Sequence, residues 1–179
     1  MLNVDHTALV LIDIQGKLAS LMHDRDALYA QLQILIKGAH ALQLPILWLE
    51  QYPKGLGPTI PEVAELLPDQ QPLAKTCFSA CGLGAFTEAL RKTGRRQVLL
   101  AGIETHICVY QSARDLLDDG MYVEVVADAV SSRTAQNKAI GLEKLLHCGA
   151  QITSVEMCLM ELLRRAGSPQ FKEIASLIK

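Results

Sequence analysis

Short apolar runs that alternate with longer amphipathic stretches constrain this chain more than any other feature of its sequence. The runs at residues 8–12 and 98–102 are apolar at nearly every position and have the length of a strand. The stretch at 24–42 instead repeats its apolar side chains at helical spacing. Because an all-apolar strand is buried on both faces, this alternation is typical of a parallel sheet covered by helices on two sides.

The same reading extends along the whole chain and predicts a single domain over residues 1–179. Strands are expected at residues 8–12, 45–49, 72–75, 98–102, 122–127 and from 151. Helices are expected from Asp24 or Asp26 to 42, and at 84–93, 106–119 and 135–148, with two more beginning at a capping box from Thr153 and at Ser168. The predicted fold is therefore an α/β fold, a three-layer α/β/α sandwich around a six-stranded parallel sheet of the Rossmann-like type.

Charge and cysteine usage exclude several classes of partner. Seventeen basic residues against nineteen acidic ones leave a formal charge of −2, so no basic excess exists to neutralise nucleic acid. No apolar run approaches the length of a membrane span, and no basic segment precedes the first run as in a signal peptide. The odd number of cysteines, five, does not suit a disulfide scaffold, so we expect a cytoplasmic protein. The charge and the short apolar runs predict that it has no nucleic-acid and no membrane partner.

Three chemically complementary residues stand at or just beyond predicted strand ends: Asp13, Lys75 and Cys108. With Thr105 as the predicted helix cap, Cys108 falls in the first helical turn, where free backbone amides favour a thiolate and could also bind an oxyanion. Lys75 would stabilise the thiolate further, and Asp13 could carry the proton. The spacing alone is equally consistent with a packed cysteine, a surface lysine and a capping aspartate.

The chain resembles the isochorismatase-like cysteine hydrolase superfamily, which includes nicotinamidases and carbamoylsarcosine amidase. The matching segments occur in the family's order at residues 8–15 (ALVLIDIQ), 50–57 (EQYPKGLG), 75–82 (KTCFSACG), 102–109 (GIETHICV) and 128–133 (DAVSSR). The resemblance implies strand order 3-2-1-4-5-6 and a catalytic triad of Asp13, Lys75 and Cys108. It also implies a cis peptide bond between Ile103 and Glu104, with the Glu104 and Cys108 amides as an oxyanion hole.

Two departures from the family's patterns limit what the resemblance implies. Nicotinamidases place an aspartate and a histidine after the second strand to hold a metal, whereas this chain has Glu50–Pro53 there and no histidine between His40 and His106. We therefore expect no metal and no cofactor. True isochorismatases lack the nucleophilic cysteine, so the presence of Cys108 argues against that reaction.

These features predict a hydrolase that acts on a small amide or related acyl compound through a thioester on Cys108. Gln15, Tyr52 and Phe78 are the expected substrate contacts. A redox-active thiol protein, using Cys108 with Cys77 or Cys81, and a non-catalytic small-molecule-binding protein remain alternatives. The aliphatic composition and the resemblance predict a homo-oligomer, a dimer or larger, whose interface lies near the pocket.

Overall fold

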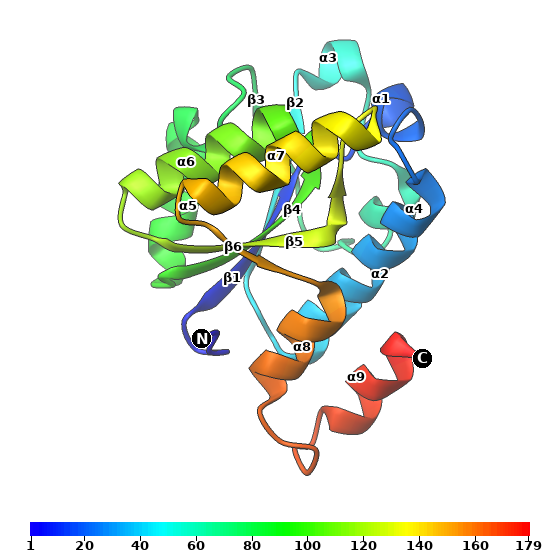
Figure 1. Cartoon of the computed structure of the whole chain (residues 1–179), viewed down its shortest axis with the longest axis vertical. Coiled ribbons are helices and arrows are strands. Elements are labelled where there is room, and N and C mark those ends of the chain that lie inside the picture. The colour runs from blue at the N-terminus through cyan, green and yellow to red at the C-terminus, as the bar shows by residue number, and fades with distance from the viewer.

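The sheet that the apolar runs predict is present and lies between two layers of helices (Figure 1). The computed structural model describes residues 1–179. Its six strands run parallel in the order β3-β2-β1-β4-β5-β6. They comprise β1 (Thr7–Ile12), β2 (Ile46–Gln51), β3 (Leu73–Lys75), β4 (Gln97–Ile103), β5 (Tyr122–Ser131) and β6 (Gln151–Thr153). The three-layer α/β/α sandwich and the strand order are confirmed.

Nine α-helices and two short turns of other helical types connect and flank these strands. The helices are α1 (Gly16–Ser20), α2 (Arg25–Ala41), α3 (Pro53–Leu56), α4 (Pro61–Ala64), α5 (Gly84–Thr93), α6 (Tyr110–Asp118), α7 (Ala135–His147), α8 (Val155–Leu163) and α9 (Phe171–Ile178). A 3₁₀ turn, η1, covers Ala80–Gly82, and a π-helical turn, η2, covers Thr105–Val109. No helix joins the length and the apolar content that crossing a bilayer requires.

The central strand β1 shows why the runs are apolar at every position. Leu9 and Leu11 face the core beneath α2, α8 and α9, whereas Val10 and Ile12 face the core beneath α5, α6 and α7. All six residues of β1 are buried. Since successive side chains of a strand point to opposite faces, a strand between two helical layers needs apolar residues throughout. Each leucine or isoleucine buried in this way stabilises the fold by about 1.5–3 kcal/mol.

The start of the helix after β4 differs from the prediction. Thr105 was expected to cap a regular helix, but Glu104 precedes the first helical residue and no side chain caps the turn. The Val109 amide donates to the Glu104 carbonyl, five residues back, so the first turn is a π turn with one residue more than a regular turn. Cys108 is therefore the fourth helical residue rather than the third.

The capping box predicted from Thr153 is also displaced by one residue. Ser154 is the cap of α8, and its hydroxyl accepts a hydrogen bond from the Met157 amide. Thr153 stays in β6. Ser154 rather than Thr153 caps the helix, because β6 includes Thr153 and the chain turns one residue later than predicted.

Gly102 lets β4 approach β1 closely just before the candidate site. Its φ angle of +118° lies in a region that side chains avoid, and a β-carbon there would lie 2.1 Å from the Ile12 carbonyl oxygen. The register between β4 and β5 also shifts between Leu100 and Gly102. Gly102 therefore permits the close approach of β4 to β1 immediately before the chain enters the site.

Candidate active site

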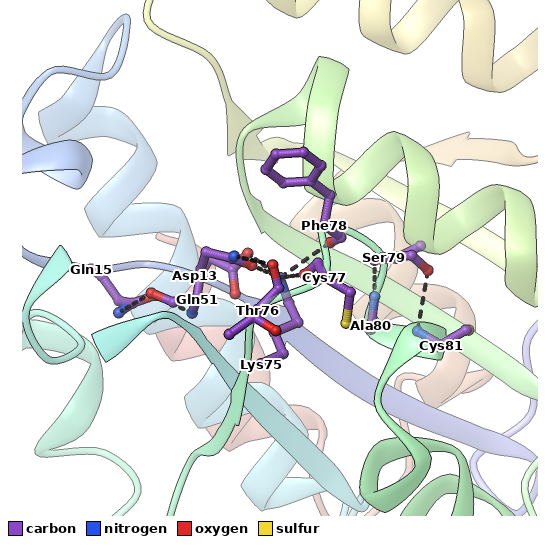
Figure 2. A network of polar contacts seen from close by, with 11 residues as sticks. Asp13, Gln15, Gln51, Lys75, Thr76, Cys77, Phe78, Ser79, Ala80 and Cys81 are labelled. Carbon is purple, nitrogen blue, oxygen red and sulfur yellow. Dashed lines mark hydrogen bonds and ion pairs between the residues drawn. The ribbon is translucent and has the colours of Figure 1, made fainter. Parts of the chain in front are cut away.

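Two of the three candidate residues form a buried ion pair at the carboxyl edge of the sheet. Asp13 follows β1 and Lys75 ends β3, with β2 between them. The Lys75 ammonium lies 2.6 Å from Asp13 Oδ2, and the two side chains are 0% and 2% exposed. Figure 2 shows Lys75 reaching across the end of β2 to meet Asp13. The ligand-binding edge of a parallel sheet therefore holds a charge pair removed from water.

The Lys75 ammonium makes three more contacts, and one of them brings in Gln51, a residue that the sequence did not single out. Gln51 Oε1 accepts a hydrogen bond from Nζ at 2.7 Å. The carbonyls of Phe78 and Cys77 accept at 3.1 and 3.2 Å. Gln51 is the register partner of Lys75 across β2 and β3. The sequence did not mark Gln51, because the apolar pattern ended the second strand at residue 49 and the register was not visible in it.

Burial raises the pKa of Asp13 above its usual value. The Lys75 charge and its hydrogen bond oppose this shift, and so does the neighbouring Cys108 thiol. Asp13 Oδ1 is buried and has no hydrogen-bond partner. Asp13 also adopts a φ angle of +53°, a conformation that residues other than glycine rarely adopt and that is often found at functional sites. A carboxylate with one open oxygen and a raised pKa is suited to accept a proton.

Burial and the charge of Asp13 oppose the two effects expected to favour a Cys108 thiolate, the helix start and Lys75. Burial, followed by the charge of Asp13, raises the pKa of Cys108 to about 12, although Lys75 lowers it. The side chain is 8% exposed. The stabilisation of a thiolate by the helix N-terminus is outweighed, because the thiol is buried and lies near the Asp13 carboxylate. Cys108 must therefore give up its proton as it acts as a nucleophile.

Glu104 links the turn of Cys108 to the end of β5. The peptide bond between Ile103 and Glu104 is cis, as the resemblance implies. The buried Glu104 carboxylate accepts hydrogen bonds from the Arg133 amide and from Arg133 Nε, each at 3.1 Å. His106 contacts Ser132 Oγ through Nδ1 at 2.9 Å, so this ring nitrogen is engaged by the segment after β5 rather than by Cys108. The oxyanion-binding role of the Glu104 and Cys108 amides stays a prediction.

The segment after β2 is anchored by buried polar groups. The Glu50 carboxylate accepts hydrogen bonds from the Thr59 amide and hydroxyl at 2.6 and 2.8 Å. Gln15, fully buried, donates to the carbonyls of Gln51 and Gly57 and accepts from the Gln51 amide. These contacts give Gln15 a structural task, and its contribution to substrate binding stays a prediction.

Tyr52 and Phe78, the other expected substrate contacts, are 54% and 55% exposed. Tyr52 follows β2 and Phe78 follows β3, so both belong to the edge of the sheet that carries the triad. Figure 2 shows the Phe78 ring pointing away from Lys75 while its carbonyl faces the ammonium. Their contact with substrate also stays a prediction.

Two hollows are lined by none of the candidate site residues. One of about 500 Å³ lies between α5 and the end of α6 and is lined by Cys81, Leu90, Arg95 and Asp119 among others. A second, of about 410 Å³, includes Arg25, Tyr29 and Glu62. No group of three or more histidine, cysteine, aspartate or glutamate side chains is placed to hold a metal ion.

Known proteins resemble this chain in sequence and in fold. Residues 7–157 match the Isochorismatase domain. The mouse isochorismatase domain-containing protein 2A is 39% identical over 180 residues, which cover 98% of this chain and 84% of the mouse protein.

Two solved structures superpose closely. The structure of MAR1 ribonuclease from Caenorhabditis elegans has a TM-score of 0.93 at 37% identity, covering 99% of this chain and 91% of that one. The Escherichia coli YcaC gene product, described as an octameric hydrolase of unknown specificity, has a TM-score of 0.93 at 26% identity. That match covers 99% of this chain and 88% of the bacterial chain.

Proposed function

Because the chain belongs to the isochorismatase-like family of hydrolases, we propose that it is a cysteine hydrolase acting on a small amide or related acyl compound. Asp13, Lys75 and Cys108 would form its catalytic triad. The observation that carries the proposal is the buried ion pair of Asp13 and Lys75 beside the Cys108 thiol. Burying two charges costs folding free energy. A role for Asp13 in accepting the proton of the nucleophile Cys108 would explain why the pair is kept.

The first half of the reaction forms a thioester. Cys108 Sγ bonds to the substrate carbonyl carbon while the thiol proton passes to Asp13, and the carbonyl oxygen becomes an oxyanion. The amides of Glu104 and Cys108 would hold that oxyanion. When the intermediate collapses, the bond to the leaving nitrogen breaks and Asp13 returns the proton to the departing amine.

Water completes the cycle. Asp13 takes a proton from the attacking water, the carbon–sulfur bond breaks, and the proton returns to Cys108 as the acid leaves. Lys75 keeps a positive charge near Asp13 in every step, which limits how far burial raises the pKa of that carboxyl. The raised pKa of Cys108 supports this order of events, since attack and deprotonation must occur together.

A closed homo-oligomer is part of the proposal. The octameric relative supports it, and so does the exposure of Tyr52 and Phe78 at the sheet edge that carries the triad. A neighbouring subunit that covered these rings would bury apolar area and narrow the entrance to Cys108. Light scattering should then give a mass well above the 19.6 kDa of one chain, and a single species of 19.6 kDa at micromolar concentration would contradict it.

The ribonuclease name of one relative suggests a second activity to compare. Two features of this chain disfavour RNA as its substrate. The formal charge is −2, and the basic cluster formed by Arg91, Lys92, Arg95 and Arg96 lies next to the amino end of β4, opposite the triad. RNA bound by that cluster would contact the edge of the sheet opposite Cys108.

The test is a screen of small amides with intact-mass detection of an acyl-enzyme, with RNA in a parallel arm. The wild-type protein should gain the mass of the acyl group and release amine. Cys108→Ala should lose both, whereas Cys148→Ala, which removes a thiol from the far end of α7, should keep them. Turnover that persists in Cys108→Ala would refute the covalent mechanism and favour the redox or binding alternatives.

A further inference from the structure

The segment that joins β3 to η1, residues 76–79, supplies two of the four contacts of the Lys75 ammonium but has little backbone support of its own. The carbonyls of Cys77 and Phe78 accept hydrogen bonds from Nζ. The amides of Cys77, Phe78 and Ser79 donate to no backbone carbonyl. The position of these carbonyls must therefore be set by side-chain contacts.

Gln51 Nε2 donates to the Thr76 carbonyl at the start of the segment, and two side chains of α6 hold its end. Ser79 Oγ donates to Asp115 Oδ2 at 2.5 Å, and the Ala80 amide donates to Ser112 Oγ at 2.8 Å. Ser112 is fully buried and Ser79 is 8% exposed. Ser79 Oγ also accepts a hydrogen bond from the Cys81 amide, which ties the segment to η1 (Figure 2). The segment is thus attached at its end by α6 and by the turn that follows.

The helix that makes these attachments also carries the nucleophile. The turn η2, with Cys108, continues directly into α6. Ser112 and Asp115 follow Cys108 by four and seven residues, a spacing that places them on the same side of a helix. The continuous helix formed by η2 and α6 therefore carries Cys108 and also holds the segment whose carbonyls contact Lys75.

We propose that Ser112 and Asp115 are positioning residues that act through residues 77–80 to hold the Lys75 ammonium against Asp13. The inference rests on the proposed function, because it assigns the two residues to the triad described there. When either anchor is removed, the Cys77 and Phe78 carbonyls can move, and Lys75 keeps only Asp13 and Gln51 as partners inside the protein. The ammonium then exchanges its protons faster and is less well aligned with Cys108.

The first test observes Lys75 without any substrate. In protein labelled with ¹⁵N-lysine, the buried ammonium should give a slowly exchanging ¹H–¹⁵N signal, assigned by its absence in Lys75→Met. Asp115→Ala and Ser112→Ala should shift or broaden it, whereas Asp115→Asn, which can still accept from Ser79, should restore it. Asp118→Ala is the matched control, since Asp118 lies on the same helix, is 70% exposed and meets only Arg114. A Lys75 signal that both alanine variants leave unchanged would overturn the proposal.

The second test asks whether Asp115 acts through Lys75. The rate at which iodoacetamide labels Cys108, read from the Cys108 peptide, should fall roughly three- to tenfold in Asp115→Ala, because contacts within one network couple by amounts of this order. In the Lys75→Met background the same substitution should have no further effect. An equal loss in both backgrounds would mean that Asp115 acts through packing alone, and the positioning role would be wrong. If Asp115→Ala moves the Lys75 signal while Cys108→Ala retains turnover, the positioning role stands and the proposed function fails.

Discussion

Replacing Lys75 with methionine should destabilise the protein far more than the loss of a surface charge. The side chains of Lys75 and Asp13 are 0% and 2% exposed, so the two residues form a buried ion pair. Removing one partner of such a pair lowers the free energy of unfolding by about 3–5 kcal/mol. Methionine keeps the volume and the apolar stem of lysine, so the cost arises from the carboxylate that is left uncompensated.

The structure also sets a ceiling on this cost. Without Lys75, whose charge lowers the pKa of Asp13, that pKa rises further and the carboxyl takes up a proton on folding. Proton uptake at pH 7 costs about 1.4 kcal/mol for each pH unit above the ordinary pKa of 3.8, or about 4 kcal/mol at most. For a chain of this length, a loss of that size lowers Tm by roughly 8–16 °C.

The loss of stability in Lys75→Met should increase as the pH rises. A carboxyl whose pKa is raised in the folded state keeps its full stability below the ordinary pKa of 3.8 and loses it as pH rises through the raised value. The difference in Tm between Lys75→Met and wild type should therefore be small near pH 4 and grow toward pH 7. Thermal unfolding followed by circular dichroism across this range measures it.

Two control variants test whether the loss of stability arises from a buried charge pair. Arg91→Met removes an exposed ion pair with Glu88 and should change Tm by little at any pH. Asp13→Asn combined with Lys75→Met removes both charges of the pair and should be more stable than Lys75→Met alone at pH 7. A Tm loss for Lys75→Met that matches Arg91→Met, or that does not vary with pH, would show that the pair is not a buried charge pair.

Three further predictions follow from the same contacts. Because burial and Asp13 raise the pKa of Cys108 to about 12, its labelling by iodoacetamide should still climb with pH at pH 9, and a plateau below pH 9 would contradict this. Asp13→Asn removes a charge that raises the pKa of Cys108, so it should label at least as fast as wild type while hydrolysis is lost, as measured by peptide mapping beside the amide screen. Gly102→Ala should give little folded protein, because its β-carbon would lie 2.1 Å from the Ile12 carbonyl oxygen, whereas Gly84→Ala, with nothing within 4 Å, should fold as wild type by circular dichroism.

Much of the architecture could be predicted because it depends on patterns between neighbouring residues. The all-apolar run in β1 indicates a strand covered on two faces, and the periodicity and terminal glycine of α5 predicted its bounds at residues 84–93. Parallel strands place their carboxyl ends at one edge, so Asp13 and Lys75 could be expected to meet although 62 residues separate them. The family resemblance supplied the strand order, which local patterns do not contain.

The tertiary structure alone decided how the site is held and charged. Gln51 and Lys75 lie 24 residues apart, and Ser79 and Asp115 lie 36 apart, so no local pattern marks either pair. The π turn before α6 depends on how the chain leaves β4, and the raised pKa of Cys108 depends on burial and on the nearness of Asp13. Sequence patterns report which side chains avoid water, whereas hydrogen-bond partners and pKa values follow from which groups packing brings together and removes from water.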